Sequence, residues 1–208
     1  MNNDLFSDQP EVAFEIRDAD LEIDFWENFI SGELAAQFYF DLFATTLWTQ
    51  PEIQMYGKSI LIPRLTSWFG DAGAAYRYSG IKNVPQPWTP ALQDLRSRVE
   101  QRVGEEFNSV LLNFYRGGQD HISWHSDNEK ELGSCPAIAS LSFGGARKFA
   151  IRTVHSAARQ KIYELPLTSG SLMCMRGRTQ DSWQHCIRKT SQIAEPRINL
   201  TFRKVLSR

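Results

Sequence analysis

The chain lacks the features that would place it in a membrane or send it out of the cell. Its 208 residues contain no run approaching the roughly 20 apolar residues of a membrane-spanning helix. The first dozen residues are polar and acidic, with neither the basic nor the apolar segment of a secretory signal. We therefore expect a protein that is not secreted and has no membrane partner, located in the cytoplasm or, in a eukaryote, in the nucleus.

Cysteine is scarce as well. The three cysteines, Cys135, Cys174 and Cys186, are odd in number and show no C-x-x-C spacing. They are typical of reduced thiols rather than of a disulfide framework. Cys186 adjoins His185 but would point to the opposite face of a strand, so we do not predict it as a metal ligand.

The net charge of −1 hides a strong asymmetry. Residues 1–60 carry 12 acidic and 2 basic side chains, whereas residues 141–208 carry 3 acidic and 13 basic ones. Two interpretations are open. The basic segment could form a face that binds nucleic acid, or the two ends of the chain could pack against each other.

Short alternating segments dominate the chain from about residue 108. They are SVLLNFY, IASLSF, KFAIRTV, KIYELPL, GSLMCM, SWQHCI and RINLTFRK, with glycine and proline between them. This spacing predicts a mainly β protein with flanking helices, whose core is a double-stranded β-helix, or jelly roll. Internal repeats and low-complexity tracts are absent.

The N-terminal half is predicted to hold two helices and a hairpin. Residues 1–24 are expected to form a loosely ordered arm, after which apolar residues recur at helical spacing up to Leu42. Alternating residues around Gly57 predict a hairpin. Thr89 and Gly104 are placed to begin and end a second helix.

Histidine is also rare, and one of the four histidines lies in an H-x-D pair formed by His125 and Asp127. Residues two apart on a strand share a face, so the two side chains could hold one metal ion. With His185 on another strand they would make the two-histidine, one-carboxylate triad of non-haem Fe(II) oxygenases. The pair alone is weak, because a histidine on a strand is more often an ordinary core or surface residue. His121 lacks a carboxylate two residues later, and His155 is typical of a solvent loop.

The segment 197–203 adds a second signal. Arg197, Asn199, Thr201 and Arg203 share one strand face, and apolar residues share the other. Guanidinium groups on the inside of a sheet need an anion, and arginine matches carboxylates with a bidentate fork. A dicarboxylate such as 2-oxoglutarate would satisfy both arginines, and its keto-acid end chelates iron.

Together these residues resemble the AlkB family of Fe(II)/2-oxoglutarate-dependent nucleic-acid dealkylases. The matching motifs are N-x-Y at Asn113 and Tyr115, the H-x-D pair, the distal His185, and R-x-N-x-T-F-R. The resemblance extends from about Tyr56 to Val205. The stretches MYGK, YRYSG and NLTFRKV are most similar to the branch that repairs duplex DNA.

The resemblance implies three segments within one compact domain. Residues 1–50 would be an acidic arm and helix, residues 51–107 a nucleotide-recognition lid with its supporting helix, and residues 108–208 the catalytic core. It also implies Fe(II) as cofactor, with 2-oxoglutarate and O₂ as co-substrates. Arg197 would bind the remote carboxylate of 2-oxoglutarate and Arg203 the carboxylate near iron. The same pocket would include Asn113, Tyr115, Asn199 and Thr201.

The reaction implied is direct repair of N-alkylated DNA bases of the 1-methyladenine and 3-methylcytosine type. Decarboxylation of 2-oxoglutarate to succinate would accompany hydroxylation of the alkyl carbon, and the resulting hemiaminal would release an aldehyde. The implied substrate contacts are Tyr56 as a wedge, Tyr76 and Tyr78 in the lid, Glu129 at the base edge, and Arg188 and Lys189 at phosphates. Structural roles remain alternatives: Glu129 lies in a charged turn, and Tyr56 could be a rim aromatic.

Other functions are compatible with the same iron core. The chemistry could act on RNA or protein, and RNA is the alternative partner to alkylated DNA. A catalytically silent reader of alkylated nucleic acid is disfavoured by the intact triad and both arginines. A structural cupin holding another metal is disfavoured by the R-x-N-x-T-F-R strand. No obligate protein partner is evident.

Overall fold

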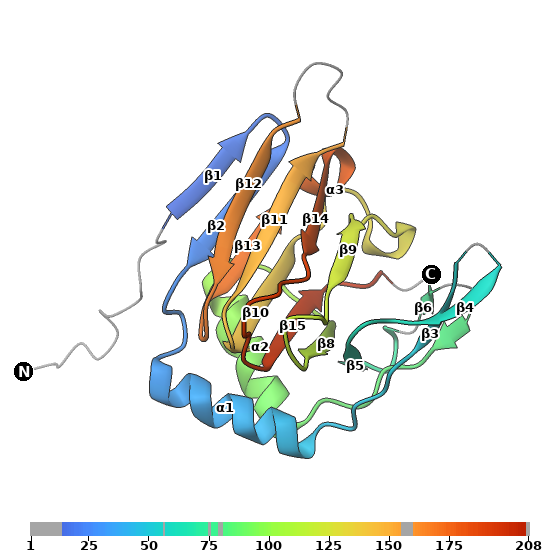
Figure 1. Ribbon diagram of the computed structural model, residues 1–208, viewed down its shortest axis with the longest axis vertical. Coiled ribbons are helices and arrows are strands. Elements are labelled where there is room, and N and C mark those ends of the chain that lie inside the picture. The colour runs from blue at the N-terminus through green and yellow to red at the C-terminus, as the bar shows by residue number, and fades with distance from the viewer. Residues whose placement is uncertain (1–13, 56, 75, 79–80, 155–159, 207–208) are drawn as a thin grey trace, which may run out of the picture.

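Two antiparallel sheets face each other in the computed structural model (Figure 1). It describes all residues except 1–13, 56, 75, 79–80, 155–159 and 207–208. The larger sheet runs in the order β1 (Phe14–Asp18), β2 (Leu21–Trp26), β13 (Leu172–Arg176), β10 (Ile138–Gly144), β15 (Arg197–Arg203), β8 (Ser109–Tyr115) and β5 (Leu65–Gly70). The smaller runs in the order β12 (Ile162–Leu167), β11 (Arg147–Thr153), β14 (Trp183–Ile187) and β9 (Ile122–His125). The predicted jelly roll with flanking helices is confirmed.

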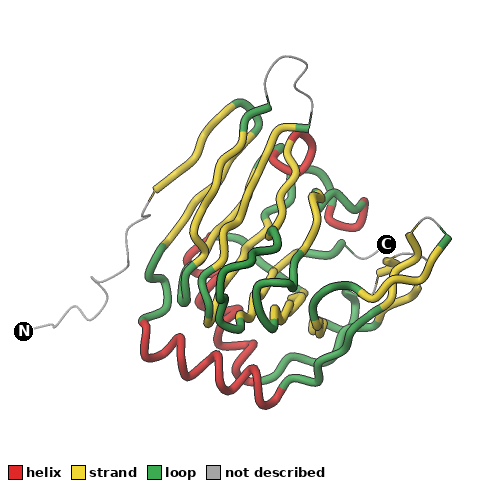
Figure 2. Tube along the Cα trace, in the orientation of Figure 1, coloured by secondary structure: helices red, strands yellow, loops and turns green. Residues whose placement is uncertain are grey.

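The helices cover the side of the large sheet that faces away from the small one. In Figure 2 the two long helices lie along the lower part of the molecule, α1 (Gly32–Thr45) and α2 (Pro90–Val103). Their buried residues share one hydrophobic cluster with the apolar face of β15. A second cluster fills the space between the sheets, where residues of β13 meet residues of β11, β12 and β14. None of the described helices combines the length and apolar composition that crossing a membrane requires.

Local signals explain how the second helix is bounded. The hydroxyl of Thr89 accepts a hydrogen bond from the backbone N–H of Leu92 at 3.3 Å, as expected of an N-cap. Gly104 ends the helix at φ +74°, in the left-handed region that glycine adopts without strain. Both predicted boundaries are confirmed.

Two hairpins project beside the open end of the jelly roll, on the right in Figure 1. The first joins β3 (Glu52–Met55) to β4 (Lys58–Leu61), and the second joins β6 (Tyr76–Tyr78) to β7 (Ile81–Asn83). The hairpin predicted around Gly57 is confirmed. Tyr56 lies outside the described residues.

The expectation of a loosely ordered arm is wrong from residue 14 onward. Residues 14–26 form the β1–β2 hairpin, and β2 extends the large sheet by pairing with β13. Leu21, Ile23 and Phe25 alternate along β2 and are fully buried. The acidic residues between them obscured this alternation, because their charges made the whole segment look solvated.

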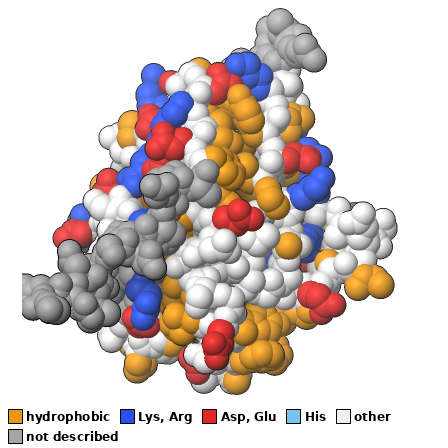
Figure 3. All heavy atoms as spheres, turned by 90° about the vertical axis from the view of Figure 1, so that its left-hand side faces the viewer, with side chains coloured by type: hydrophobic (Ala, Val, Ile, Leu, Met, Phe, Trp, Pro, Cys, Tyr) orange, Lys and Arg blue, Asp and Glu red, His pale blue; other side chains and the backbone are white. Residues whose placement is uncertain are grey.

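Charge pairing between the two ends of the chain accounts for part of the asymmetry. Asp24 on β2 accepts a hydrogen bond from Nε of Arg176 on β13 at 2.8 Å, and it also contacts Arg17. Asp18 lies 2.8 Å from Nζ of Lys161. Figure 3 shows acidic and basic side chains intermingled on this side of the molecule. The interpretation that the two ends pack together is therefore correct for these residues.

The contribution of Asp24 to the stability of this charge pairing can be tested by mutation. Burial would raise the pKa of Asp24, but Arg17 and Arg176 lower it below its ordinary value. A carboxyl group with a depressed pKa stabilises the fold at neutral pH, and this stabilisation is lost as the pH falls through the folded-state pKa. We expect Asp24→Asn to lower the free energy of unfolding by about 1.5–3 kcal/mol at pH 7, with a smaller difference from wild type in acid. Urea-induced unfolding at several pH values measures this difference.

Asp94→Asn, which removes an exposed ion pair with Arg98, is the matched control, and it should lower the free energy of unfolding by about 0.5 kcal/mol or less. Equal losses in both variants would contradict the assignment.

Candidate active site

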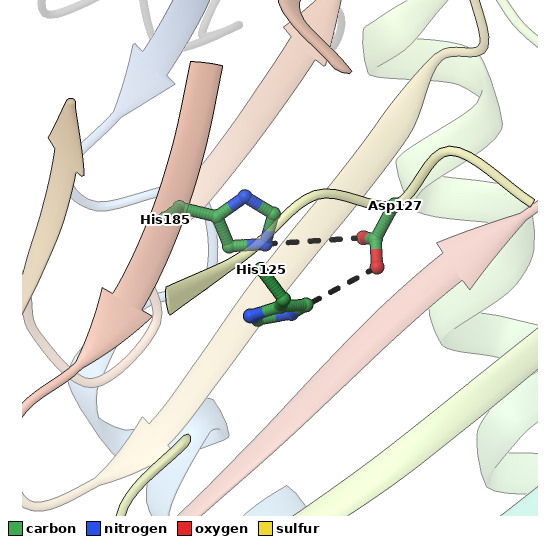
Figure 4. A group of neighbouring side chains, drawn as sticks. All are labelled: His125, Asp127 and His185. Carbon is green, nitrogen blue, oxygen red and sulfur yellow. Dashed lines mark ion pairs between the residues drawn. The ribbon is translucent and has the colours of Figure 1, made fainter. Parts of the chain in front are cut away.

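Strand pairing brings the distal histidine beside the H-x-D pair. His125 is the last residue of β9, and His185 lies directly opposite it on β14. Asp127 follows two residues later, beyond the end of the strand, so the idea that both members of the pair lie within one strand is wrong. All three side chains nevertheless converge (Figure 4).

The triad is compact enough for a single metal ion. Nε2 of His125 lies 3.9 Å from Oδ1 of Asp127, and Nε2 of His185 lies 4.0 Å from Oδ2. All three candidate ligand atoms lie within 4.8 Å of one another. His121 is not part of this group. Its ring instead contacts the backbone carbonyl of Gln119, and His155 lies outside the described residues.

The hydrogen bonding and charge of the triad suit a metal site. Nδ1 of His125 lies 2.9 Å from the carbonyl oxygen of Ser123 and donates to it, and Nε2 is the ring nitrogen on the Asp127 side. Burial lowers the pKa of His185 to about 3, which keeps this imidazole neutral. Burial by itself would raise the pKa of Asp127, but the guanidinium of Arg203 holds it below its ordinary value, so the carboxyl group is ionised. Neutral imidazoles and an ionised carboxylate are the forms that bind metal, so these residues fit an Fe(II) site.

Two neighbours hold Asp127 in place. Nη2 of Arg203 donates to Oδ1 of Asp127 at 2.9 Å. The backbone N–H of Asp127 donates to Oε1 of Gln180 at 2.8 Å. Gln180 is 2% exposed and lies on α3 (Thr179–Ser182), and its amide Nε2 contacts the Met175 sulfur. Nothing in the sequence marked this glutamine, because its role depends on how a short helix meets a distant loop.

A buried guanidinium lies deeper in the same pocket. Arg197 is 1% exposed, and its Nη2 donates to Oγ of Ser142 at 2.9 Å. Nε and Nη1 of Arg197 are buried without a hydrogen-bond partner in the protein. Its guanidinium carbon lies 5.2 Å from the centre of the Tyr115 ring. Burial lowers the pKa of Arg197 to about 10, so the group stays charged at neutral pH. Two unsatisfied donors on a buried cation mark a binding site for a carboxylate.

The other polar side chains of the pocket come from three neighbouring strands, β8, β15 and β10, and we call them the polar floor. The predicted residues Asn113, Tyr115, Asn199 and Thr201 all line the pocket, together with the triad, Arg197 and Arg203. Asn199 donates to Oγ of Ser140 at 2.8 Å, and the hydroxyl of Thr201 donates to the side chain of Asn199.

Sequence reasoning missed Ser140, which lines the pocket, and two residues that bond to its lining, Ser142 and Arg64. Ser140 and Ser142 alternate in IASLSF, and this alternation could have placed them on the interior face. Nε of Arg64 donates to Oδ1 of Asn113 at 2.7 Å, which fixes the orientation of that amide. Arg64 belongs to the stretch PR, which also resembles the AlkB family, but no role was predicted for it.

The predicted substrate contacts are less closely grouped. Oε2 of Glu129 is buried without a partner, and burial and the neighbouring Asp127 raise the pKa of Glu129. Tyr76 and Tyr78 both belong to β6, and only the path of that strand is described. Arg188 and Lys189 are exposed just beyond β14. The roles of these residues remain predictions.

Comparison with known proteins agrees with this geometry. The family model of the 2OG-Fe(II) oxygenase superfamily matches residues 23–203. Mouse alpha-ketoglutarate-dependent dioxygenase alkB homolog 3 is 46% identical over 150 residues, covering 69% of this chain and 52% of the relative. Mouse DNA oxidative demethylase ALKBH2 is 40% identical over 160 residues, covering 74% and 67%. The chain belongs to the AlkB family. This AlkB-family chain is also 41% identical to human DNA oxidative demethylase ALKBH2 over 159 residues, covering 74% of this chain and 61% of the relative. It spans about half the length of the alkB homolog 3 relatives.

Solved structures support the fold of this AlkB-family chain. The structure of OsALKBH1 superposes with a TM-score of 0.62 at 15% identity, covering 88% of this chain and 97% of the other. A prolyl hydroxylase from Trichoplax adhaerens superposes with a TM-score of 0.58 at 11% identity, covering 88% and 83%. At such low identity the likeness concerns the fold alone.

Gln180 provides a test of how the triad is held. Gln180→Leu removes the acceptor for the Asp127 N–H and leaves that donor buried and unpaired. We expect affinity for a redox-inert divalent ion such as Mn(II) to fall by about 10–100-fold, as is typical when a group supporting a metal ligand is lost. Calorimetric titration measures this. Gln184→Leu is the control, since Gln184 neighbours His185 in the chain but bonds outward to Arg152. Unchanged metal affinity in a folded Gln180→Leu protein would show that Asp127 needs no such support.

Proposed function

We propose that this protein is an Fe(II)/2-oxoglutarate-dependent dioxygenase that oxidatively dealkylates N-alkylated DNA bases of the 1-methyladenine and 3-methylcytosine type. One observation carries the proposal. A His-Asp-His triad and a buried arginine with two unpaired donors line a single pocket. The DNA oxidative demethylases among the relatives support nucleic acid as the substrate class.

The metal would be held by His125, Asp127 and His185. Bound Fe(II) supplies the oxidising chemistry with O₂ and 2-oxoglutarate, while the protein supplies the ligand geometry and a site shielded from water. Arg203 has a double role in this arrangement. It keeps Asp127 ionised and oriented, and it places a positive charge beside the metal ligands.

Arg197 would bind the remote carboxylate of 2-oxoglutarate, through the Nε and Nη1 donors that the protein leaves unpaired. Tyr115 lies over the same guanidinium and limits how it can turn. Arg203 lies at the triad end of the pocket, so the carboxylate next to the metal would lie near it. This assignment fits a dicarboxylate extended along the polar face of β15.

Glu129 would favour damaged bases. An N1-methylated adenine or N3-methylated cytosine is cationic, and a carboxylate near the base edge attracts it over the neutral base. The duplex is the proposed form of the substrate, with Tyr56 as the wedge that fills the gap left by a flipped base. Tyr76 and Tyr78 would form the lid, and Tyr78 could stack the base against His125.

The activity is tested by supplying Fe(II), 2-oxoglutarate and oligonucleotides that carry 1-methyladenine or 3-methylcytosine. We expect formaldehyde and succinate in equal amounts, with activity on DNA duplexes. Asp127→Ala should abolish turnover, because it removes one of three metal ligands, while leaving the fold largely intact. Single-stranded DNA and RNA carrying the same lesions provide the comparison. Turnover on RNA alone would show that RNA, and not DNA, is the substrate. Full turnover by Asp127→Ala would show that the triad does not take part in the reaction.

The co-substrate site has a test that does not depend on turnover. Arg197→Gln should weaken 2-oxoglutarate binding by at least a hundredfold, since losing one partner of a buried charged pair typically costs about 3–5 kcal/mol. Calorimetry with Mn(II)-loaded protein in the absence of oxygen measures it. Arg98→Gln, an exposed arginine on α2, is the control and should bind 2-oxoglutarate as the wild type does. If Arg197→Gln retains wild-type affinity, the carboxylate lies elsewhere.

A further inference from the structure

The β6–β7 hairpin depends on its two ends for its position. β6 and β7 have three residues each, and within the described part of the chain they pair only with each other. A two-stranded hairpin by itself is only marginally stable in water. Where this hairpin lies beside the open end of the jelly roll (Figure 1) is therefore set by the segments that lead into it and out of it, residues 71–74 and 84–88.

The incoming segment is fixed to the large sheet where β5 ends. The backbone N–H of Asp71 donates to the carbonyl oxygen of Asn108 at 2.9 Å. The carbonyl oxygen of Asp71 accepts from the N–H of Ala74 at 2.9 Å, which closes a turn, and Ala74 is fully buried. At Gly70, an added β-carbon would lie only 2.8 Å from the carbonyl oxygen of Asn108. The chain therefore leaves β5 in one defined direction.

The outgoing segment returns to the same strand. The N–H of Gln86 donates to the carbonyl oxygen of Trp68 at 2.9 Å, and the N–H of Gly70 donates to the carbonyl oxygen of Gln86 at 3.0 Å. The side-chain amide of Gln86 donates to the hydroxyl of Ser67 at 2.8 Å. Both ends of the hairpin segment therefore meet at β5.

One carboxylate joins these two ends to α2. Oδ1 of Asp71, before the hairpin, accepts from Nε1 of Trp88, after the hairpin, at 2.8 Å. The same oxygen accepts from Nη1 of Arg96 on α2 at 3.2 Å. The guanidinium carbon of Arg96 lies 5.0 Å from the centre of the Trp88 ring, so each of the three side chains contacts the other two. We call Asp71, Trp88 and Arg96 the hairpin anchor.

Arg96 is itself held from its other side. Its Nε donates to Oε1 of Glu100, one turn along α2, at 2.9 Å. The same carboxylate oxygen accepts from the backbone N–H of Phe107 at 2.8 Å. A guanidinium that lies against an aromatic ring and is bonded to a fixed carboxylate has little rotational freedom left to lose when it meets Asp71. The hairpin anchor is therefore ordered in advance.

The hairpin anchor lies near the surface and outside the pocket. The side chains of Asp71 and Arg96 are 49% and 27% exposed. An ion pair with this exposure contributes little to the free energy of unfolding. None of the three anchor residues lines the pocket. Removing the anchor should therefore leave the fold and the metal site intact, and its effect should be confined to the hairpin.

We propose that the hairpin anchor fixes the position of the β6–β7 hairpin and that Asp71, Trp88 and Arg96 are positioning residues for capture of the target base. The second part rests on the proposed function, in which Tyr76 and Tyr78 on β6 form the lid. A hairpin whose position is fixed beforehand loses less conformational entropy when the base binds. Loss of the anchor should therefore weaken substrate binding and leave the chemical step unchanged.

Hydrogen exchange and steady-state kinetics on the full chain test both parts. In Asp71→Ala, we expect the amides of β6 and β7 to exchange faster, while those of β8 keep their wild-type rates. The KM for an oligonucleotide that carries 1-methyladenine should rise by about three- to tenfold, because part of a base-stacking contact is lost. Because this loss concerns binding, kcat and the affinity for 2-oxoglutarate should stay near the wild-type values.

Two conservative variants and one control accompany Asp71→Ala. Asp71→Asn keeps an acceptor for Trp88 and loses the ion pair with Arg96, and Trp88→Phe keeps the ring and loses its N–H. Each should show the same changes as Asp71→Ala to a smaller degree. Asp94→Ala is the matched control, because it removes an ion pair with Arg98 on the same helix, where both side chains are 46% exposed. It should behave as the wild type does.

The outcomes distinguish failure of this proposal from failure of the proposed function. If β6 and β7 exchange no faster in Asp71→Ala than in Asp94→Ala, the hairpin anchor is overturned. Faster exchange with an unchanged KM would overturn its role in base capture. If the wild type releases no formaldehyde from methylated DNA, the proposed function fails, and the exchange rates still decide whether the anchor holds the hairpin. If Asp71→Ala also speeds exchange in β8, then Asp71→Asn and Trp88→Phe decide.

Discussion

The architecture depends on one large sheet that is buried on two chemically different sides. The apolar residues of β15 pack against the helices, and its polar residues face the small sheet. In a strand with this alternation, the apolar side chains need helices to bury them, and the polar side chains on the other side need a cavity in which they can form hydrogen bonds. The polar cavity therefore lies on the side of β15 that faces the small sheet, next to the second hydrophobic cluster between the sheets.

The ion pair between Arg203 and Asp127 joins the two halves of the site. Arg203 comes from the large sheet, and Asp127 comes from the loop that leaves the small sheet. A charged group at this depth needs a partner, so the pair fixes the separation of the metal ligands from the polar floor. Binding of metal and binding of a dicarboxylate would consequently be linked through one guanidinium. Arg197 is left with unpaired donors at the far end.

The basic residues at the surface fall into two groups. Acids of the N-terminal hairpin neutralise bases near the edge of the large sheet, where β1 and β2 complete the jelly roll. Among the described residues, Lys148, Arg152 and Arg188 lie on the outer side of the small sheet. One charge asymmetry in the chain thus has two consequences, a structural junction and a positive surface. The contacts confirm the interpretation that the two ends pack together, and a nucleic-acid-binding face remains a prediction.

Much of the core was determined by local sequence. The strands of the C-terminal half, the capped helix after Thr89 and the polar face of RINLTFR follow from periodicity and capping, which depend on near neighbours. The triad followed from H-x-D and a distal histidine, combined with family resemblance. The hairpin at residues 14–26 was missed because acidic residues masked the alternation of Leu21, Ile23 and Phe25.

Only the tertiary structure decided which distant groups meet. The pairing of β9 with β14 sets His185 opposite His125, and the position of α3 presents Gln180 to Asp127. The stacking of Arg152 and Arg188 on Trp124 brings together β11, β9 and the residue that follows β14. Such contacts depend on long-range packing between elements, and a one-dimensional pattern carries no information about which side chains will share a space.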